Sequence, residues 1–151
     1  MLIIQENPPT HFDTVRNYFT NRENVRKISS TDFSIDENEV SKYLGEFINE
    51  RPNIYAILIK KPSDTVWSLK YIGQRESQGI KQRLREHLIS CNKQTGSQLE
   101  RVELARSNGY EIGIMLVSIL PDSNGEEHFR LLYESMLIKE FSAELEWNKQ
   151  K

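Results

Sequence analysis

NIYAILIKKPSDTVWSLKYIGQRESQGIKQRLREH, residues 53–87, is the stretch that decides the fold of this chain. Two apolar runs, 54–59 and 66–72, flank a polar break that contains a proline. Such a pair of runs predicts a β-hairpin whose second strand is stopped by Gly73. Beyond the hairpin, apolar residues recur at helical spacing, so a helix is expected to begin near Gly79.

Polar side chains are placed at regular points on these elements. Each strand of the predicted hairpin carries a tyrosine, Tyr55 and Tyr71, and the helix carries Arg83 and His87. At about 100° per residue, these two helix residues share a face because they are four positions apart, whereas Arg85 points away from both. We therefore expect a polar cluster over one end of a small sheet.

The rest of the chain after residue 52 predicts a helix over 97–107, a strand over 110–120 and a helix over 126–141. The strand is continuously apolar from Ile114, which is typical of a strand covered on both faces. The order of elements is β-β-α-α-β-α, which favours a small α/β (α+β) layer architecture.

Residues 1–51 are interpreted as an N-terminal helical arm that precedes a domain over residues 52–151. Residues 1–9 are expected to be irregular, and 21–33 turn-like. Helices are predicted over 10–19 and over 34–49, the second capped by Ser34. About fifty residues are few for a separate core, so the arm is expected to pack on the domain or to form part of a dimer interface.

Several short motifs in residues 52–148 resemble those of the GIY-YIG nuclease family. They are, in chain order, Asn53-Ile54-Tyr55, Tyr71-Ile72-Gly73, Arg83 followed by His87, Glu134 within an apolar helix, and Asn148 after Trp147. Five elements in the order and approximate spacing of that family make the resemblance specific, although each tripeptide alone is a weak signal. Asn53 stands where the family usually has glycine.

The resemblance implies a three-stranded antiparallel sheet flanked by helices and a Mg²⁺-dependent endonuclease that acts on DNA. Glu134 is expected to bind a single Mg²⁺, for which Mn²⁺ substitutes, and Arg83 to hold the scissile phosphate. Tyr55 is the expected general base, with His87 as the alternative. Tyr71 and Asn148 complete the expected catalytic set, because they would orient these groups.

The charge distribution agrees with a nucleic-acid ligand. The whole chain has a net charge of −2, but residues 51–106 contain 11 Lys and Arg against 5 Asp and Glu, a local excess of +6. Phosphate contacts depend on a local positive field, whereas whole-chain charge mainly governs solubility. The candidate nucleic-acid-binding residues are Lys70, Arg75, Lys81, Arg85 and Lys93.

Composition bears on the cellular location of the protein. The chain has one cysteine, no apolar run near the roughly 20 residues of a membrane span, and an N-terminus unlike a secretion signal. We therefore expect a cytoplasmic protein without a membrane partner. A homodimer is plausible, because a nuclease with one site often needs two copies to cut both strands.

Two other functions stay open from the sequence. The first is a nucleic-acid-binding module of the same fold that does not cut, and the second is an α/β interaction protein whose local positive charge is incidental. RNA is also open as a substrate in place of DNA.

Overall fold

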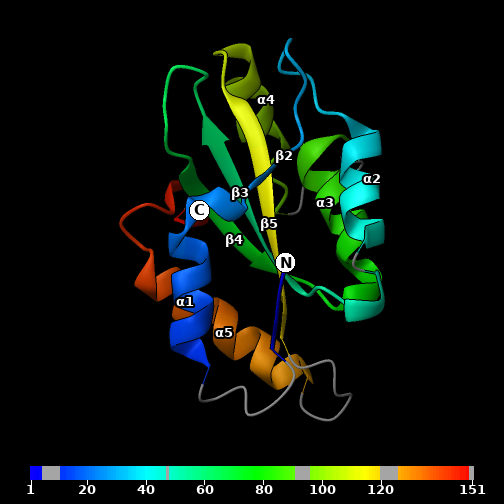
Figure 1. Ribbon diagram of the computed structural model, residues 1–151, viewed down its shortest axis with the longest axis vertical. Coiled ribbons are helices and arrows are strands. Elements are labelled where there is room, and N and C mark those ends of the chain that lie inside the picture. The colour runs from blue at the N-terminus through cyan, green and yellow to red at the C-terminus, as the bar shows by residue number, and fades with distance from the viewer. Residues whose placement is uncertain (5–10, 47, 91–95, 120–125, 150–151) are drawn as a thin grey trace.

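Five strands form one open sheet with helices on both of its faces in the computed structural model, which describes residues 1–4, 11–46, 48–90, 96–119 and 126–149 (Figure 1). Within those residues there are five α-helices. Helices α2 (Glu37–Glu46), α3 (Ile80–Leu88) and α4 (Leu99–Ser107) cover one face, and α1 (Phe12–Thr20) and α5 (Glu126–Glu140) cover the other. The mixed α/β class expected from the sequence is confirmed.

The strand order is β1 (Leu2–Ile4), β5 (Glu111–Ile119), β3 (Ile54–Lys60) and β4 (Ser68–Gln74), with β2 (Arg26–Lys27) also paired to β5. β4, β3 and β5 are antiparallel neighbours, as expected. The expected number of three strands is wrong, because β5 has two further partners. β1 pairs parallel to the C-terminal end of β5, and β2 pairs antiparallel to the N-terminal half of β5. These strands have three and two residues, too few for an alternating pattern to reveal them in the sequence.

Alternate residues of the central strand point into two separate apolar clusters. Tyr55, Ile57 and Ile59 pack with the helices α2, α3 and α4, whereas Ile54, Ala56 and Leu58 pack with α1 and α5. This period of two follows from the pleat of a strand. It explains why β3 has apolar and aromatic residues at every position from Ile54 to Ile59.

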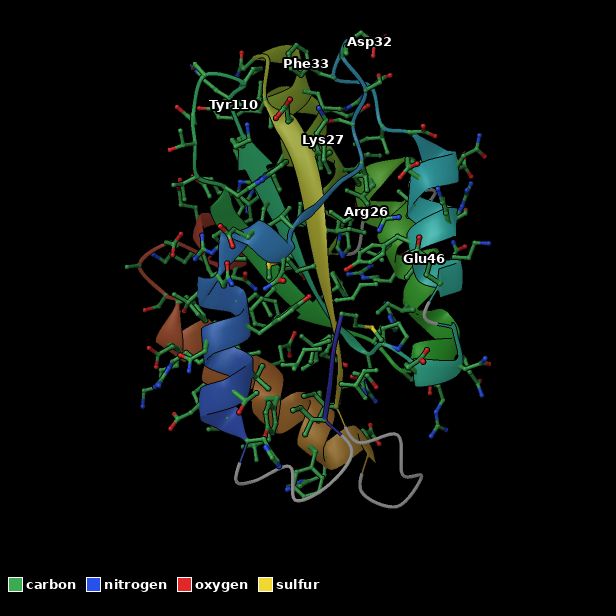
Figure 2. The ribbon with its side chains drawn as sticks, viewed as in Figure 1. Arg26, Lys27, Asp32, Phe33, Glu46 and Tyr110 are labelled. Carbon is green, nitrogen blue, oxygen red and sulfur yellow. The ribbon has the colours of Figure 1, made fainter. Side chains whose placement is uncertain are left out.

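Residues 1–51 contribute directly to this sheet and to both clusters, through β1, β2 and buried side chains such as Val15 and Val40. Arg26 on β2 forms an ion pair with Glu46 of α2, with 2.9 Å between nitrogen and oxygen, and neighbouring Lys27 pairs with Glu111 of β5 at 3.1 Å (Figure 2). The division of the chain into an arm and a domain stays a prediction.

Two details of α2 and β4 differ from the sequence expectations. Asp36, and not Ser34, caps α2, because its side-chain oxygen accepts from the backbone N–H groups of Asn38 and Glu39. Gly73 does not stop the second strand but lies inside it, paired with Tyr55.

A β-bulge in β4 directs its side chains. Ile57 pairs with Tyr71 and the next residue, Leu58, pairs with Leu69, so Lys70 is the extra residue on β4. The bulge lets Leu69 and Ile72 face the same cluster although they are three residues apart. Tyr71 therefore faces the opposite side, toward α3.

Among the helices of the described ranges, none combines the length and the apolar composition that crossing a membrane requires.

Candidate active site

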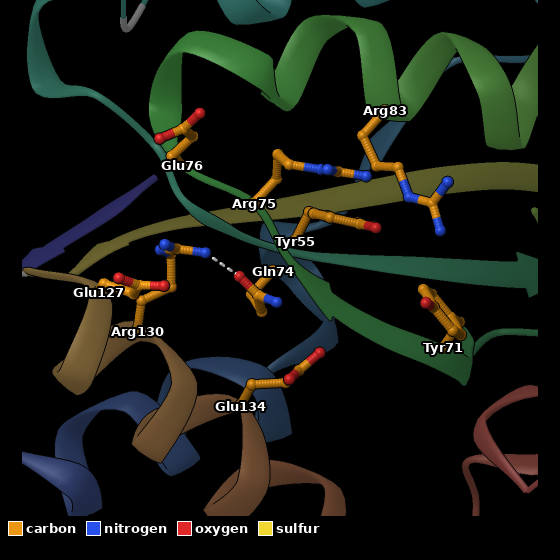
Figure 3. Close-up of a pocket in the computed structure, with 9 residues that line it drawn as sticks. All are labelled: Tyr55, Tyr71, Gln74, Arg75, Glu76, Arg83, Glu127, Arg130 and Glu134. Atoms are coloured by element: carbon orange, nitrogen blue, oxygen red, sulfur yellow. Dashed lines mark hydrogen bonds between the residues drawn. The ribbon is translucent and has the colours of Figure 1, made fainter. Parts of the chain in front are cut away.

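A polar cavity of about 440 Å³ lies at the edge strand β4, where side chains from α3 and α5 meet (Figure 3). Its lining residues are Tyr55, Tyr71, Gln74, Arg75, Glu76, Arg83, Glu127, Arg130 and Glu134. Four of the six residues that the sequence marks as catalytic therefore share one cavity. Of the other two, His87 is hydrogen-bonded to the lining residue Tyr55, and Asn148 is hydrogen-bonded to the backbone of Ile72 on β4.

His87 holds the phenol of Tyr55 from the interior. Its Nε2 lies 2.7 Å from the Tyr55 hydroxyl, and its Nδ1 accepts a hydrogen bond of 3.0 Å from the backbone N–H of Gln98. Because a neutral imidazole has one N–H and one lone pair, the lone pair is on Nδ1 and the proton is on Nε2. Burial and the nearby Arg83 lower the pKa of His87 to about 3, so the ring is neutral at neutral pH and donates to Tyr55.

Gly73 makes room for the two tyrosine rings. It pairs with Tyr55 across the hairpin, and a β-carbon at this position would lie 2.5 Å from the Tyr55 hydroxyl oxygen and 2.9 Å from Cε2 of Tyr71. The ring centroids of the two tyrosines are 6.2 Å apart. The backbone of the edge strand thus serves as the floor on which Tyr55 lies.

Arg83 brings positive charge to both phenols. It projects from α3, donates to Glu86 at 2.9 Å and to the carbonyl of Gly96 at 3.1 Å, and lines the cavity. Burial raises the pKa of Tyr55 and of Tyr71, and the charge of Arg83 together with its hydrogen bonds acts in the opposite direction. As the sequence predicts, Arg83 and His87 act on one side of α3.

Glu134 enters the cavity from the other side of the sheet, on α5 (Figure 3). Burial raises the pKa of this half-buried carboxyl, and the nearby Arg130 lowers it. The carboxylate in turn raises the pKa of Tyr71, so the two groups are within electrostatic reach. Glu134 therefore lies on the same cavity as the tyrosines although its helix covers the opposite face.

The donor set suits a hard cation that binds few protein ligands. Within the described ranges, no three His, Cys, Asp or Glu side chains gather into a metal-binding group. Mg²⁺ retains several waters and usually binds through one or two carboxylates together with substrate phosphates. The carboxylate of Glu134, which reaches the cavity beside the two tyrosines, fits that mode of binding.

Two asparagine side chains each form two hydrogen bonds with the backbone of one strand residue, as a neighbouring strand would do. Asn148, in the 3₁₀ helix Glu146–Asn148, donates to the carbonyl of Ile72 and accepts from its N–H, both at 2.9 Å. Asn53 does the same with Ile119 of β5, at 3.0 and 2.9 Å. Asn148 thus fixes the edge strand between Tyr71 and Gly73, from outside the cavity.

The residues proposed to bind nucleic acid lie in different places. Arg75 lines the cavity, whereas Lys81 is exposed on α3 and lines another one. Lys70 pairs with Glu146 at 2.6 Å, and Arg85 pairs with Glu37 on α2 and so points away from Arg83 as expected. Lys93 lies outside the described residues. The local positive charge is thus partly neutralised by carboxylates of the flanking segments.

Four residues of the cavity were not predicted, namely Gln74, Glu76, Glu127 and Arg130. Arg130 had a usable signal, because it lies four residues before Glu134 and therefore on the same face of the helix. Gln74 had none, because it lies beyond the glycine that the sequence treats as the end of the strand.

Comparisons of the chain with models of protein families, with curated proteins and with solved structures found no match.

Proposed function

We propose that this protein is a Mg²⁺-dependent endonuclease that hydrolyses phosphodiester bonds of DNA, with a site like that of the GIY-YIG nucleases. The observation that carries the proposal is the convergence of Tyr55, Tyr71, Arg83 and Glu134 on one polar cavity. Tyr55 and Tyr71 are on strands β3 and β4, Arg83 is on α3 and Glu134 is on α5, so no single helix or strand explains their meeting.

Positive and negative side chains balance in the lining of the cavity, which is consistent with a bound cation that attracts the substrate phosphate. Three arginines and three glutamates line it, namely Arg75, Arg83, Arg130, Glu76, Glu127 and Glu134. An equal number of each leaves little net attraction for a phosphate. Glu134 would hold Mg²⁺, and the ion would supply positive charge that the protein side chains leave uncompensated. The guanidinium of Arg83 would bind two oxygens of one phosphate at the same time, and it stays charged at every relevant pH.

The tautomer of His87 supports Tyr55 as the general base. The only lone pair of the imidazole accepts the N–H of Gln98, so His87 takes up a proton only by losing that hydrogen bond. Its Nε2–H and Arg83 both donate toward the Tyr55 oxygen, which favours the phenolate. Burial nevertheless raises the pKa of Tyr55, so we expect cutting to increase with pH across the alkaline range.

The test is cleavage of plasmid, branched and single-stranded DNA, and of RNA, with Mg²⁺ or with EDTA. Metal-dependent cutting should disappear in Glu134→Gln and Arg83→Gln. Glu140→Gln, an exposed residue at the end of the same helix as Glu134, is the matched control and should cut like the wild type. Absence of cutting on every substrate, with the protein folded and Mg²⁺ present, refutes the proposal.

The remaining alternatives give distinct results in the same assay. Retention of DNA in a gel without any cleavage indicates a binding module that does not cut. Cleavage of RNA alone would mean that the substrate of the proposal is wrong and that the proposed reaction, phosphodiester hydrolysis, is right. Sedimentation of the protein with and without DNA tests the proposed homodimer, which would present one cavity to each strand.

A further inference from the structure

A buried arginine, Arg130, lies at one end of the cavity and has no role in the reaction proposed above. Arg130 on α5 is only 8% exposed, yet it lines the cavity. Burying a guanidinium is costly unless it is hydrogen-bonded or bound to an anion. Arg130 keeps its positive charge on the lining of the cavity, so it can contact an anionic ligand there.

Gln74 fixes the direction of this arginine. It follows Ile72 by two residues on β4, so it points to the same side, toward α5. Nη1 of Arg130 donates to its side-chain oxygen (Figure 3). The amide oxygen of Gln74 accepts that bond, so its N–H groups are the donors that this side chain can offer a ligand.

Arg130 and Arg83 lie at separate ends of the cavity, with Tyr55 and Gln74 between them (Figure 3). They approach from α5 and α3, which cover opposite faces of the sheet. A ligand that contacts both guanidinium groups at once therefore carries two separated anionic groups. A nucleic-acid backbone does so, because it carries one phosphate per nucleotide.

We propose that Arg130 and Gln74 form a second phosphate subsite, which binds the backbone phosphate adjacent to the one held at Arg83. This inference rests on the proposed function, since it assigns the neighbouring phosphate of the same substrate. It makes a polynucleotide, with at least two consecutive phosphodiesters, the ligand class of the cavity, and it disfavours a mononucleotide or a phosphomonoester.

A different role for Arg130 makes a different prediction. Its positive charge lowers the pKa of Glu134 and opposes the effect of burial. If that were its whole role, Arg130→Gln would shift the pH dependence of metal-supported cutting and leave the number of phosphate contacts unchanged. The salt dependence of binding separates the two, because each phosphate contact releases counterions.

The experiment measures the affinity for a fluorescent duplex DNA in EDTA, over a range of salt concentrations. Arg130→Gln should reduce the slope of log affinity against log salt by about one unit. Arg130→Lys keeps the charge and should keep most of the slope. The matched control is Arg16→Gln on α1, a residue that does not line the cavity, and it should leave the slope unchanged. An unchanged slope in a folded Arg130→Gln protein overturns the subsite.

A second measurement needs no variant, in case Arg130→Gln does not fold. The wild-type protein is offered a trinucleotide with two phosphodiesters, or the same trinucleotide with either linkage replaced by a neutral methylphosphonate. Two occupied subsites predict binding of the fully charged form tighter by about tenfold, which is the effect of one charge-assisted contact. Equal binding of the charged and neutral forms overturns the proposal.

The failure of this inference and the failure of the proposed function are distinguishable. DNA binding with a slope that depends on Arg130, but without any cleavage, supports the subsite and refutes the nuclease. Cleavage with a slope independent of Arg130 does the reverse. A wild-type protein that binds neither probe overturns both.

Discussion

Gly73→Ala tests whether the backbone of the edge strand determines where Tyr55 lies. The new β-carbon would lie 2.5 Å from the hydroxyl oxygen and 2.6 Å from Cζ of Tyr55, and 2.9 Å from Cε2 of Tyr71. Contacts of a β-carbon with non-bonded heavy atoms are essentially never that short in real proteins. Tyr55 has little room to yield, because it is 1% exposed and hydrogen-bonded to His87.

The cost follows from two losses. Overpacking of a filled core costs about 1–3 kcal/mol, and losing the Tyr55–His87 hydrogen bond costs about 1 kcal/mol. Together they lower the free energy of unfolding by roughly 2–4 kcal/mol. At about 2–4 °C per kcal/mol for a chain of this size, the midpoint of thermal unfolding should fall by roughly 4–16 °C.

The assay is unfolding in urea and by heat, followed by circular dichroism. The matched control is Gly45→Ala in α2, where a β-carbon meets nothing within 4 Å. That variant should be more stable than the wild type by roughly 0.5–1 kcal/mol, because alanine favours the helix. The reasoning is refuted if Gly73→Ala is as stable as the wild type, or if the two variants change stability in the same direction.

Three further outcomes follow from the same geometry. Asn148→Ala removes both hydrogen bonds to Ile72, so the free energy of unfolding in urea should fall by about 1–3 kcal/mol; an unchanged value would mean that the edge strand needs no partner. The pKa of His87 is lowered to about 3, below its unfolded value of about 6.5, so its contribution to stability is lost as the pH falls from about 6.5 toward 3, by about 1.4 kcal/mol per pH unit. The difference in unfolding free energy between wild type and His87→Gln should shrink accordingly in urea titrations at pH 7, 6, 5 and 4, and a constant difference would contradict a buried neutral imidazole. Tyr55→Phe should abolish cutting but preserve DNA binding, whereas near-normal turnover would transfer the role of base to His87.

Local pattern was sufficient for most of the elements. The spacing of apolar residues predicted all five α-helices of the described part of the chain, and the two apolar runs on either side of a proline-containing break predicted the hairpin. It also predicted that Arg83 and His87 share a face of α3 and that Arg85 points elsewhere. These inferences succeed because the periods of a helix and a strand are fixed by backbone geometry within a few residues.

Long-range pairing was the part that local pattern missed. β1 and β2 exist because the edge of β5 offers them hydrogen bonds, and nothing within their few residues indicates a strand. The sequence predicts that Gly73 ends the strand, but Gly73 lies inside β4 and accommodates the Tyr55 ring. Its true role depends on a residue eighteen positions away.

The order of amino acids fixed which side chains are present and, in the helices and the regular strand β3, which face each one takes; in β4 the bulge changed those faces. The tertiary structure alone decided that Glu134, carried by a helix on one face of the sheet, reaches the same cavity as Tyr55 and Arg83 on the other. It also decided that the backbone of Gln98 orients the imidazole of His87, and that Arg130 and Gln74 meet. The physical reason is that β4 is an edge strand, beyond which the two helical layers approach each other, and only the packing of the whole chain creates that edge.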